Sequence, residues 1–151
     1  MLMNKHMLSG LVIAAGALMA SPAFAGAAKP ATVSKAQAAK SCRYYHGQAH
    51  DTSGYRKAIQ WCSLAANKGD FSVVPTIVAL YEKLPRNAAN LKRLAGWTWT
   101  EARYYYQLGK DAKSTARRHH YRTLANKKLA QAKRLEAKAS ELAQHANGGG
   151  S

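Results

Sequence analysis

The chain has 151 residues and is strongly basic, with 23 Lys and Arg against 7 Asp and Glu, a formal net charge of +16. This length gives one modest domain with a hydrophobic core and excludes an architecture of several ordinary domains. The charge excess favours anionic partners over cationic ones.

The first 25 residues are typical of an export signal. Lys5 lies in a short polar start, the apolar core from Leu8 to Ala20 is too short to span a bilayer, and Ala23 and Ala25 supply small residues for cleavage. An uncleaved membrane anchor is the alternative, and the short core argues against it. We therefore expect cleavage after Ala25, no transmembrane segment in the mature chain, and a periplasmic or secreted location.

The remaining chain divides into three parts. Residues 26–33 read as a flexible leader, residues 34–147 as a single helical domain, and residues 148–151 as a flexible Gly-rich tail.

Export also determines how the two cysteines are interpreted. Cys42 and Cys62 lie in the mature chain, and an oxidising compartment favours their pairing. If their two helices form an antiparallel hairpin around Thr52, each cysteine lies ten residues from the turn, at a similar height. We predict a structural disulfide, because the spacing is not the C-x-x-C of a redox site.

An amphipathic helix is predicted within Tyr55 to Phe71. Its apolar residues recur at steps of three and four, and Gly69 follows the last of them, where a left-handed residue can end a helix. The apolar face comprises Tyr55, Ala58, Ile59, Cys62, Ala65 and Ala66. Such a helix needs a neighbour on each side to bury this face.

The same stretch resembles one repeat of a known family. Its pattern is similar to the second helix of a Sel1-like repeat, a relative of the tetratricopeptide repeat, and is carried by Tyr55, Lys57, Ala58, Trp61, Ala65, Ala66, Gly69 and Asp70. One repeat would span about Ala38 to Asp70, or about a quarter of the chain. The resemblance implies stacked antiparallel helical hairpins and a non-enzymatic role in protein binding.

Two further helices are expected before the basic region. The third begins with Ser72 as its cap and ends at Pro85, and the fourth runs from Asn87 to Leu108. The fourth carries too many aromatic residues for one face, since side chains two residues apart diverge by about 200°. Its candidate partner-binding residues are Trp97, Trp99, Tyr104 and Tyr105. The alternative is that these rings pack between the third and fifth helices.

A long last helix is predicted from about Lys113 to Ala146. Its apolar residues approximate a heptad stripe that Lys128 interrupts. Lys110 to Lys138 holds ten Lys or Arg against two acids, and we take Arg117, Arg118 and Arg122 as further candidate partner-binding residues. A solvated face is the alternative to an anionic partner such as a lipid or polymer surface. Charge would also suit nucleic acid, but export argues against it as the native partner.

The residues with catalytic or metal-binding chemistry form no recognisable site. No nucleophile elbow, zinc-protease motif or phosphate loop occurs, and His46 and His50 supply only two ligands at helical spacing. Glu82 and Glu101 are the least implausible pair of catalytic carboxylates. We expect no enzyme activity, catalytic residue, metal or cofactor.

The predicted protein is therefore all-α, with about five helices in stacked antiparallel hairpins, a long C-terminal helix and one disulfide. We expect an exported module that binds another envelope or secreted protein. The alternative is a cationic protein that attaches to anionic envelope components through its basic last helix.

Overall fold

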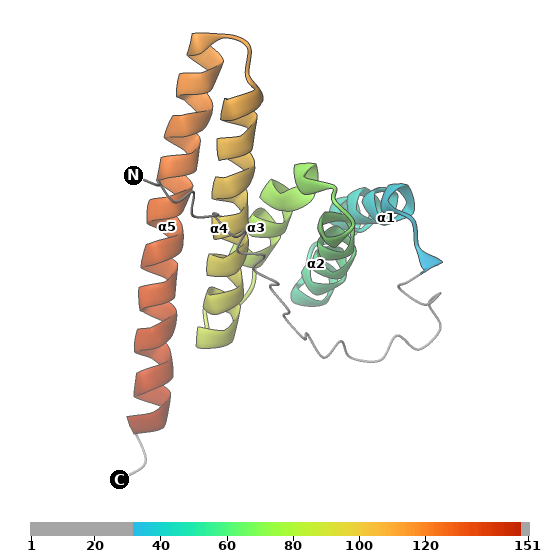
Figure 1. Ribbon diagram of the computed structural model, residues 1–151. Helices are drawn as coiled ribbons and strands as arrows, with labels where there is room; N and C mark the ends of the chain where they lie inside the picture. The colour runs from blue at the N-terminus through green and yellow to red at the C-terminus, as the bar shows by residue number, and fades with distance from the viewer. Residues whose placement is uncertain (1–31, 149–151) are drawn as a thin grey trace, which may run out of the picture.

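The computed structural model describes residues 32–148, and in this part of the chain helices are joined by short loops with no strands (Figure 1). Its elements are α1 (Lys35–Gln48), α2 (Thr52–Asn67), the short 3-10 helix η2 (Phe71–Val73), α3 (Val74–Glu82), α4 (Ala88–Asp111) and α5 (Thr115–Gly148). The fold class, with five α-helices in this part and a long last helix, is confirmed. The predicted export signal and most of the predicted leader lie outside the described residues, as do residues 149–151.

Polar side chains cap the starts of α1, α2 and α4. Ser34 and Gln37 form a reciprocal capping box at α1, Asp51 accepts from the Gly54 N–H at α2 over 2.7 Å, and Asn87 accepts from the Asn90 N–H at α4 over 2.9 Å.

The predicted boundaries of α3 and α4 differ from the structure, and α3 ends at Glu82, before Pro85. Ser72 does not cap α3 but lies in η2, where its hydroxyl donates to the Asp70 carboxylate, and α3 begins at Val74 with Pro75 in its first turn. Gly109 does not end α4, because the helix continues to Asp111. Gly109 is buried against α5, and a Cβ there would lie 3.3 Å from the Cβ of Tyr121. Its missing side chain permits close helix packing.

The end of α2 confirms the role predicted for Gly69. This residue has a φ of 90°, and its N–H donates to the Ala66 carbonyl while the Asp70 N–H donates to that of Ala65. These bonds satisfy carbonyls that the helix end would otherwise leave unpaired.

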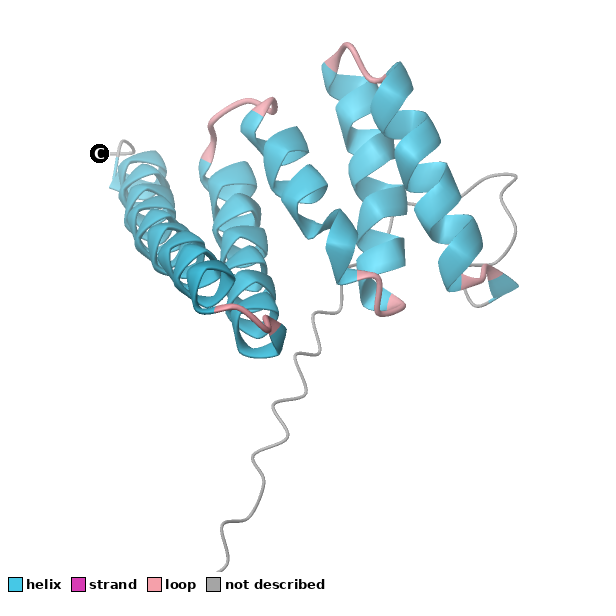
Figure 2. Cartoon of the chain, turned by 90° about the horizontal axis from the view of Figure 1, so that it is seen from above, coloured by secondary structure: helices cyan, strands magenta, loops and turns pink. Residues whose placement is uncertain are grey.

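Each helix packs mainly on its neighbours in the chain, α1 on α2, α2 on α3, α3 on α4 and α4 on α5 (Figure 2). The predicted disulfide joins α1 to α2, with the Cα atoms of Cys42 and Cys62 4.5 Å apart. The main apolar core lies among α1, α2, α3 and the first half of α4, and Ala139 of α5 joins it. Val33, assigned to the leader from sequence, is half-buried against this core.

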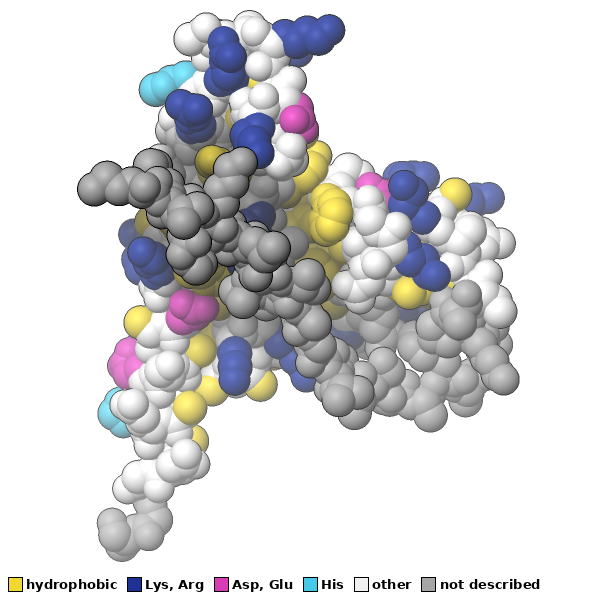
Figure 3. Space-filling model, in the orientation of Figure 1, with side chains coloured by type: hydrophobic (Ala, Val, Ile, Leu, Met, Phe, Trp, Pro, Cys, Tyr) yellow, Lys and Arg dark blue, Asp and Glu magenta, His cyan; other side chains and the backbone are white. Residues whose placement is uncertain are grey.

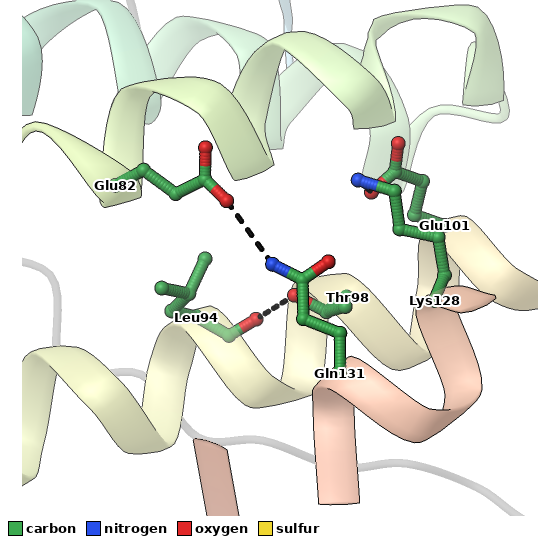
Figure 4. A network of polar contacts seen from close by, with 6 residues as sticks. All are labelled: Glu82, Leu94, Thr98, Glu101, Lys128 and Gln131. Atoms are coloured by element: carbon green, nitrogen blue, oxygen red, sulfur yellow. Dashed lines mark hydrogen bonds and ion pairs between the residues drawn. The ribbon is translucent and has the colours of Figure 1, made fainter. Parts of the chain in front are cut away.

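The α4–α5 hairpin is the longest part of the fold, and its upper end in Figure 1 projects beyond α3. Small residues at heptad spacing, Ala125, Ala132 and Ala139, form the buried residues of α5. Lys128, which interrupts the predicted stripe, lies 2.8 Å through its Nζ from Oε2 of Glu101, a carboxylate only 2% exposed (Figure 4). The apparent defect in the heptad is one half of a buried ion pair.

Candidate functional site

The two tryptophans of α4 face different neighbours. Trp97 is half-buried and packs against the main core, whereas the Trp99 indole N–H donates to Oε1 of Glu136 on α5 over 2.9 Å. Their divergence agrees with the two-residue spacing. Trp99 therefore marks the flank of α4 that runs beside α5.

Tyrosine rings fill the inside of the hairpin near its tip. The ring centre of Tyr105 lies 5.7 Å from that of Tyr104 and 6.4 Å from that of Tyr121. Burial raises the pKa of Tyr105, and the neighbouring Glu101 carboxylate raises it further. Tyr104 and Tyr105 are thus partly engaged with other rings, whereas the adjacent Tyr106 is 57% exposed.

The first turns of α5 carry the three arginines predicted from sequence, and all three are exposed. Arg118 and Arg122 line a shallow recess of about 320 Å³ with Thr115 and His119. The Arg118 guanidinium donates to the Thr115 hydroxyl over 3.3 Å. The structure therefore brings Arg118 and Arg122 together beside the hairpin turn.

A second recess of about 400 Å³ lies at the other end of the fold, between the start of α1 and Trp61. The Trp61 ring stacks on Tyr45 at 6.1 Å, and the Lys57 ammonium lies 4.4 Å from the centre of the Tyr45 ring. Trp61, one of the residues of the repeat-like pattern, is half-buried against the core.

The acidic residues of the chain all lie in the described part, and each has an interaction there. Asp51 caps α2, Asp70 accepts from Ser72, Glu82 from Gln131, Asp111 from Gln107 and Glu136 from Trp99, while Glu101 and Glu141 pair with Lys128 and Lys138. Only these last two form ion pairs with Lys or Arg within residues 32–148. The other Lys and Arg side chains there have no carboxylate within ion-pair distance.

Excess positive charge is most concentrated on the α4–α5 hairpin. Figure 3 shows Lys and Arg side chains around its upper end, with few acidic side chains among them. From Arg103 to Lys127 the hairpin has seven Lys or Arg, and Asp111 is its one acid. Such a surface attracts anions over a Debye length of about 10 Å at 0.1 M salt.

One flank of the hairpin combines this charge with aromatic side chains. Residues at steps of four and three form a stripe along α4: Lys92, Gly96, Trp99, Arg103, Tyr106 and Lys110. The Trp99–Glu136 bond and the close approach of Gly109 to Tyr121 place this stripe beside the flank of α5 that carries Arg118, Arg122 and Lys133. We call these two rows together the outer face.

The opposite flank of α5 contacts α3. The Gln131 side-chain amide donates to Oε1 of Glu82 on α3 over 3.1 Å (Figure 4). Lys127 and Arg134 lie on this side by helical spacing, since each is four or three residues from Gln131. The two flanks of α5 are therefore distinguishable by their neighbours.

Sequence reasoning missed two features of this region. Arg103 and Lys110 were not recognised as outer-face residues, although the spacing of Lys92, Trp99 and Tyr106 by sevens was a readable signal. The burial of Glu101 was also missed, because no local pattern links it to Lys128, 27 positions away.

Glu82 and Glu101 engage different partners on α5, Gln131 and Lys128. Within residues 32–148 no group of three or more His, Cys, Asp or Glu is placed to hold a metal ion. In the same residues no helix is long and apolar enough to cross a membrane.

No family model, curated protein or solved structure matches the chain.

Proposed function

We propose that the protein is an exported, non-enzymatic interaction module that binds an anionic partner through the tip of its α4–α5 hairpin. The observation that carries this proposal is the unbalanced charge, because the only Lys and Arg in ion pairs within the described chain are Lys128 and Lys138. The exposed Arg117, Arg118 and Arg122 are the central contact residues. The Cys42–Cys62 disulfide is compatible with an oxidising compartment.

An anionic partner is favoured over an apolar one by the exposure of the side chains. The apolar surface of α1 to α3 is largely used in the core, whereas the hairpin tip presents guanidinium groups. Arginine binds carboxylates and phosphates through a planar fork of donors. The proposal covers acidic proteins, phosphate polymers and anionic lipid surfaces.

The test measures binding of the mature protein to three anionic probes: polyglutamate, polyphosphate and vesicles containing phosphatidylglycerol. We expect binding to at least one probe, weakening steeply as salt rises. The variant Arg117→Glu, Arg118→Glu and Arg122→Glu should abolish it without changing the helical circular dichroism.

A matched control separates a specific surface from net charge. The exposed Lys35, Lys40 and Arg43 of α1 can be reversed to Glu with the same change in net charge. We expect this variant to keep most of the binding. Equal loss in the two triple variants, or no binding to any of the three probes, would contradict the proposal.

A further inference from the structure

We infer that the outer face of the α4–α5 hairpin lies flat on an anionic phospholipid bilayer. This inference rests on the proposed function and names one partner and one orientation for it. It concerns a row of side chains on α4, which is separate from the three arginines of α5 in the proposed function. The surface consists of the α4 stripe from Lys92 to Lys110 and the adjoining α5 flank.

The shape of this surface is extended. The α4 stripe runs from Lys92 to Lys110 of one continuous helix, or about 27 Å at a rise of about 1.5 Å per residue. Lys92, Arg103, Tyr106 and Lys110 are all exposed, and Trp99 is half-exposed. A long exposed row of this kind suits a planar partner.

The charge of the outer face is strongly positive. It carries six cations, Lys92, Arg103, Lys110, Arg118, Arg122 and Lys133, and none of them forms an ion pair within residues 32–148. Glu136, a carboxylate on this flank of α5, accepts a hydrogen bond from Trp99. Each Lys or Arg near an anionic bilayer contributes roughly a fivefold increase in binding.

The aromatic residues favour a bilayer over a phosphate polymer. Trp99 and Tyr106 alternate with Arg103 along the stripe, and such amphipathic rings settle at the headgroup level of a membrane. Proteins that bind single-stranded nucleic acid instead use a charged groove in which bases stack on aromatic rings. The stripe has few aliphatic side chains, so the contact is adsorption at the surface and not insertion.

The decisive experiment compares two pairs of substitutions with the same change in charge. Arg103→Glu with Lys110→Glu alters the outer face, and Lys127→Glu with Arg134→Glu alters the opposite flank of α5. Sedimentation with vesicles of phosphatidylcholine and phosphatidylglycerol measures partitioning, and pure phosphatidylcholine vesicles give the background. We expect the outer-face pair to weaken partitioning at least about 30-fold and the opposite pair to weaken it far less.

The outcomes of this experiment can be distinguished from those that test the proposed function. Equal weakening by the two pairs would overturn the orientation. Binding to soluble polyphosphate without binding to vesicles would overturn the bilayer and leave the proposed function standing, whereas binding to neither would also remove the proposed function for phosphate partners. If a Glu variant loses helical circular dichroism, the corresponding Gln pair gives the same comparison with a smaller change in charge.

A second measurement tests the aromatic contact without changing charge. Tyr106→Ala should reduce vesicle partitioning several-fold, because an exposed ring at the headgroup level is removed. Tyr44→Ala is the matched control, since Tyr44 is 62% exposed on α1, far from the outer face in the chain. Equal partitioning by these two variants would overturn the aromatic contact with the bilayer.

Discussion

The α1–α3 region and the α4–α5 hairpin are stabilised in different ways. The first buries Ile, Val, Leu and Ala side chains around a disulfide, and its helices are short. The second consists of two long helices that meet through alanines, a glycine, tyrosine rings and the Glu101–Lys128 pair. The unbalanced charges are therefore densest where the apolar core is thinnest. Residues at the tip that filled a large hydrophobic core would not be available for the exposed cationic surface.

The largest effect is expected from breaking the buried ion pair. Lys128→Met leaves the Glu101 carboxylate buried without its cation, which should lower the free energy of unfolding by about 3 to 5 kcal/mol. Chemical denaturation followed by circular dichroism measures the loss. The double variant Glu101→Leu with Lys128→Met should recover most of it, because the buried charge is removed as well. A single variant as stable as the native protein would show that Glu101 does not need its partner.

The next effect concerns the other region. Replacing Cys42 and Cys62 by Ala should lower the free energy of unfolding by roughly 3 kcal/mol, since the bridge closes a loop over a separation of 20 residues. Helical circular dichroism should remain, because the bridge acts mainly on the unfolded chain. Reduction of the native protein should reproduce the loss. Two free thiols in protein freshly isolated from its native compartment would contradict the pairing.

The smallest effect compares two glycines of α4. Gly96 is exposed with no atom within 4 Å of an added Cβ, so Gly96→Ala should raise the free energy of unfolding by about 0.5 to 1 kcal/mol. Gly109→Ala should gain less or lose stability, because its Cβ would meet Tyr121 at 3.3 Å. Thermal unfolding of the two variants measures the difference. Equal gains would mean that the hairpin tip adjusts freely at this contact.

The sequence predicted the positions of the helices better than the contacts between them. Periodicity, caps and the left-handed Gly69 located the helices, and the symmetric positions of Cys42 and Cys62 predicted the disulfide. These signals are local, so they can be read without tertiary contacts. The partnership of Lys128 with Glu101 is set by how α4 and α5 dock, and no single helix contains that information. The same holds for the outer face, which needs both helices.

The packing of each helix on its chain neighbours also affects how the protein folds. Contacts between successive helices close only short loops, so little chain entropy is lost before each contact forms. Helical proteins rich in local contacts fold in microseconds to milliseconds. The α1–α2 hairpin can therefore assemble and acquire its disulfide before α4 and α5 have met. The fold can grow from its N-terminal end, one helix at a time.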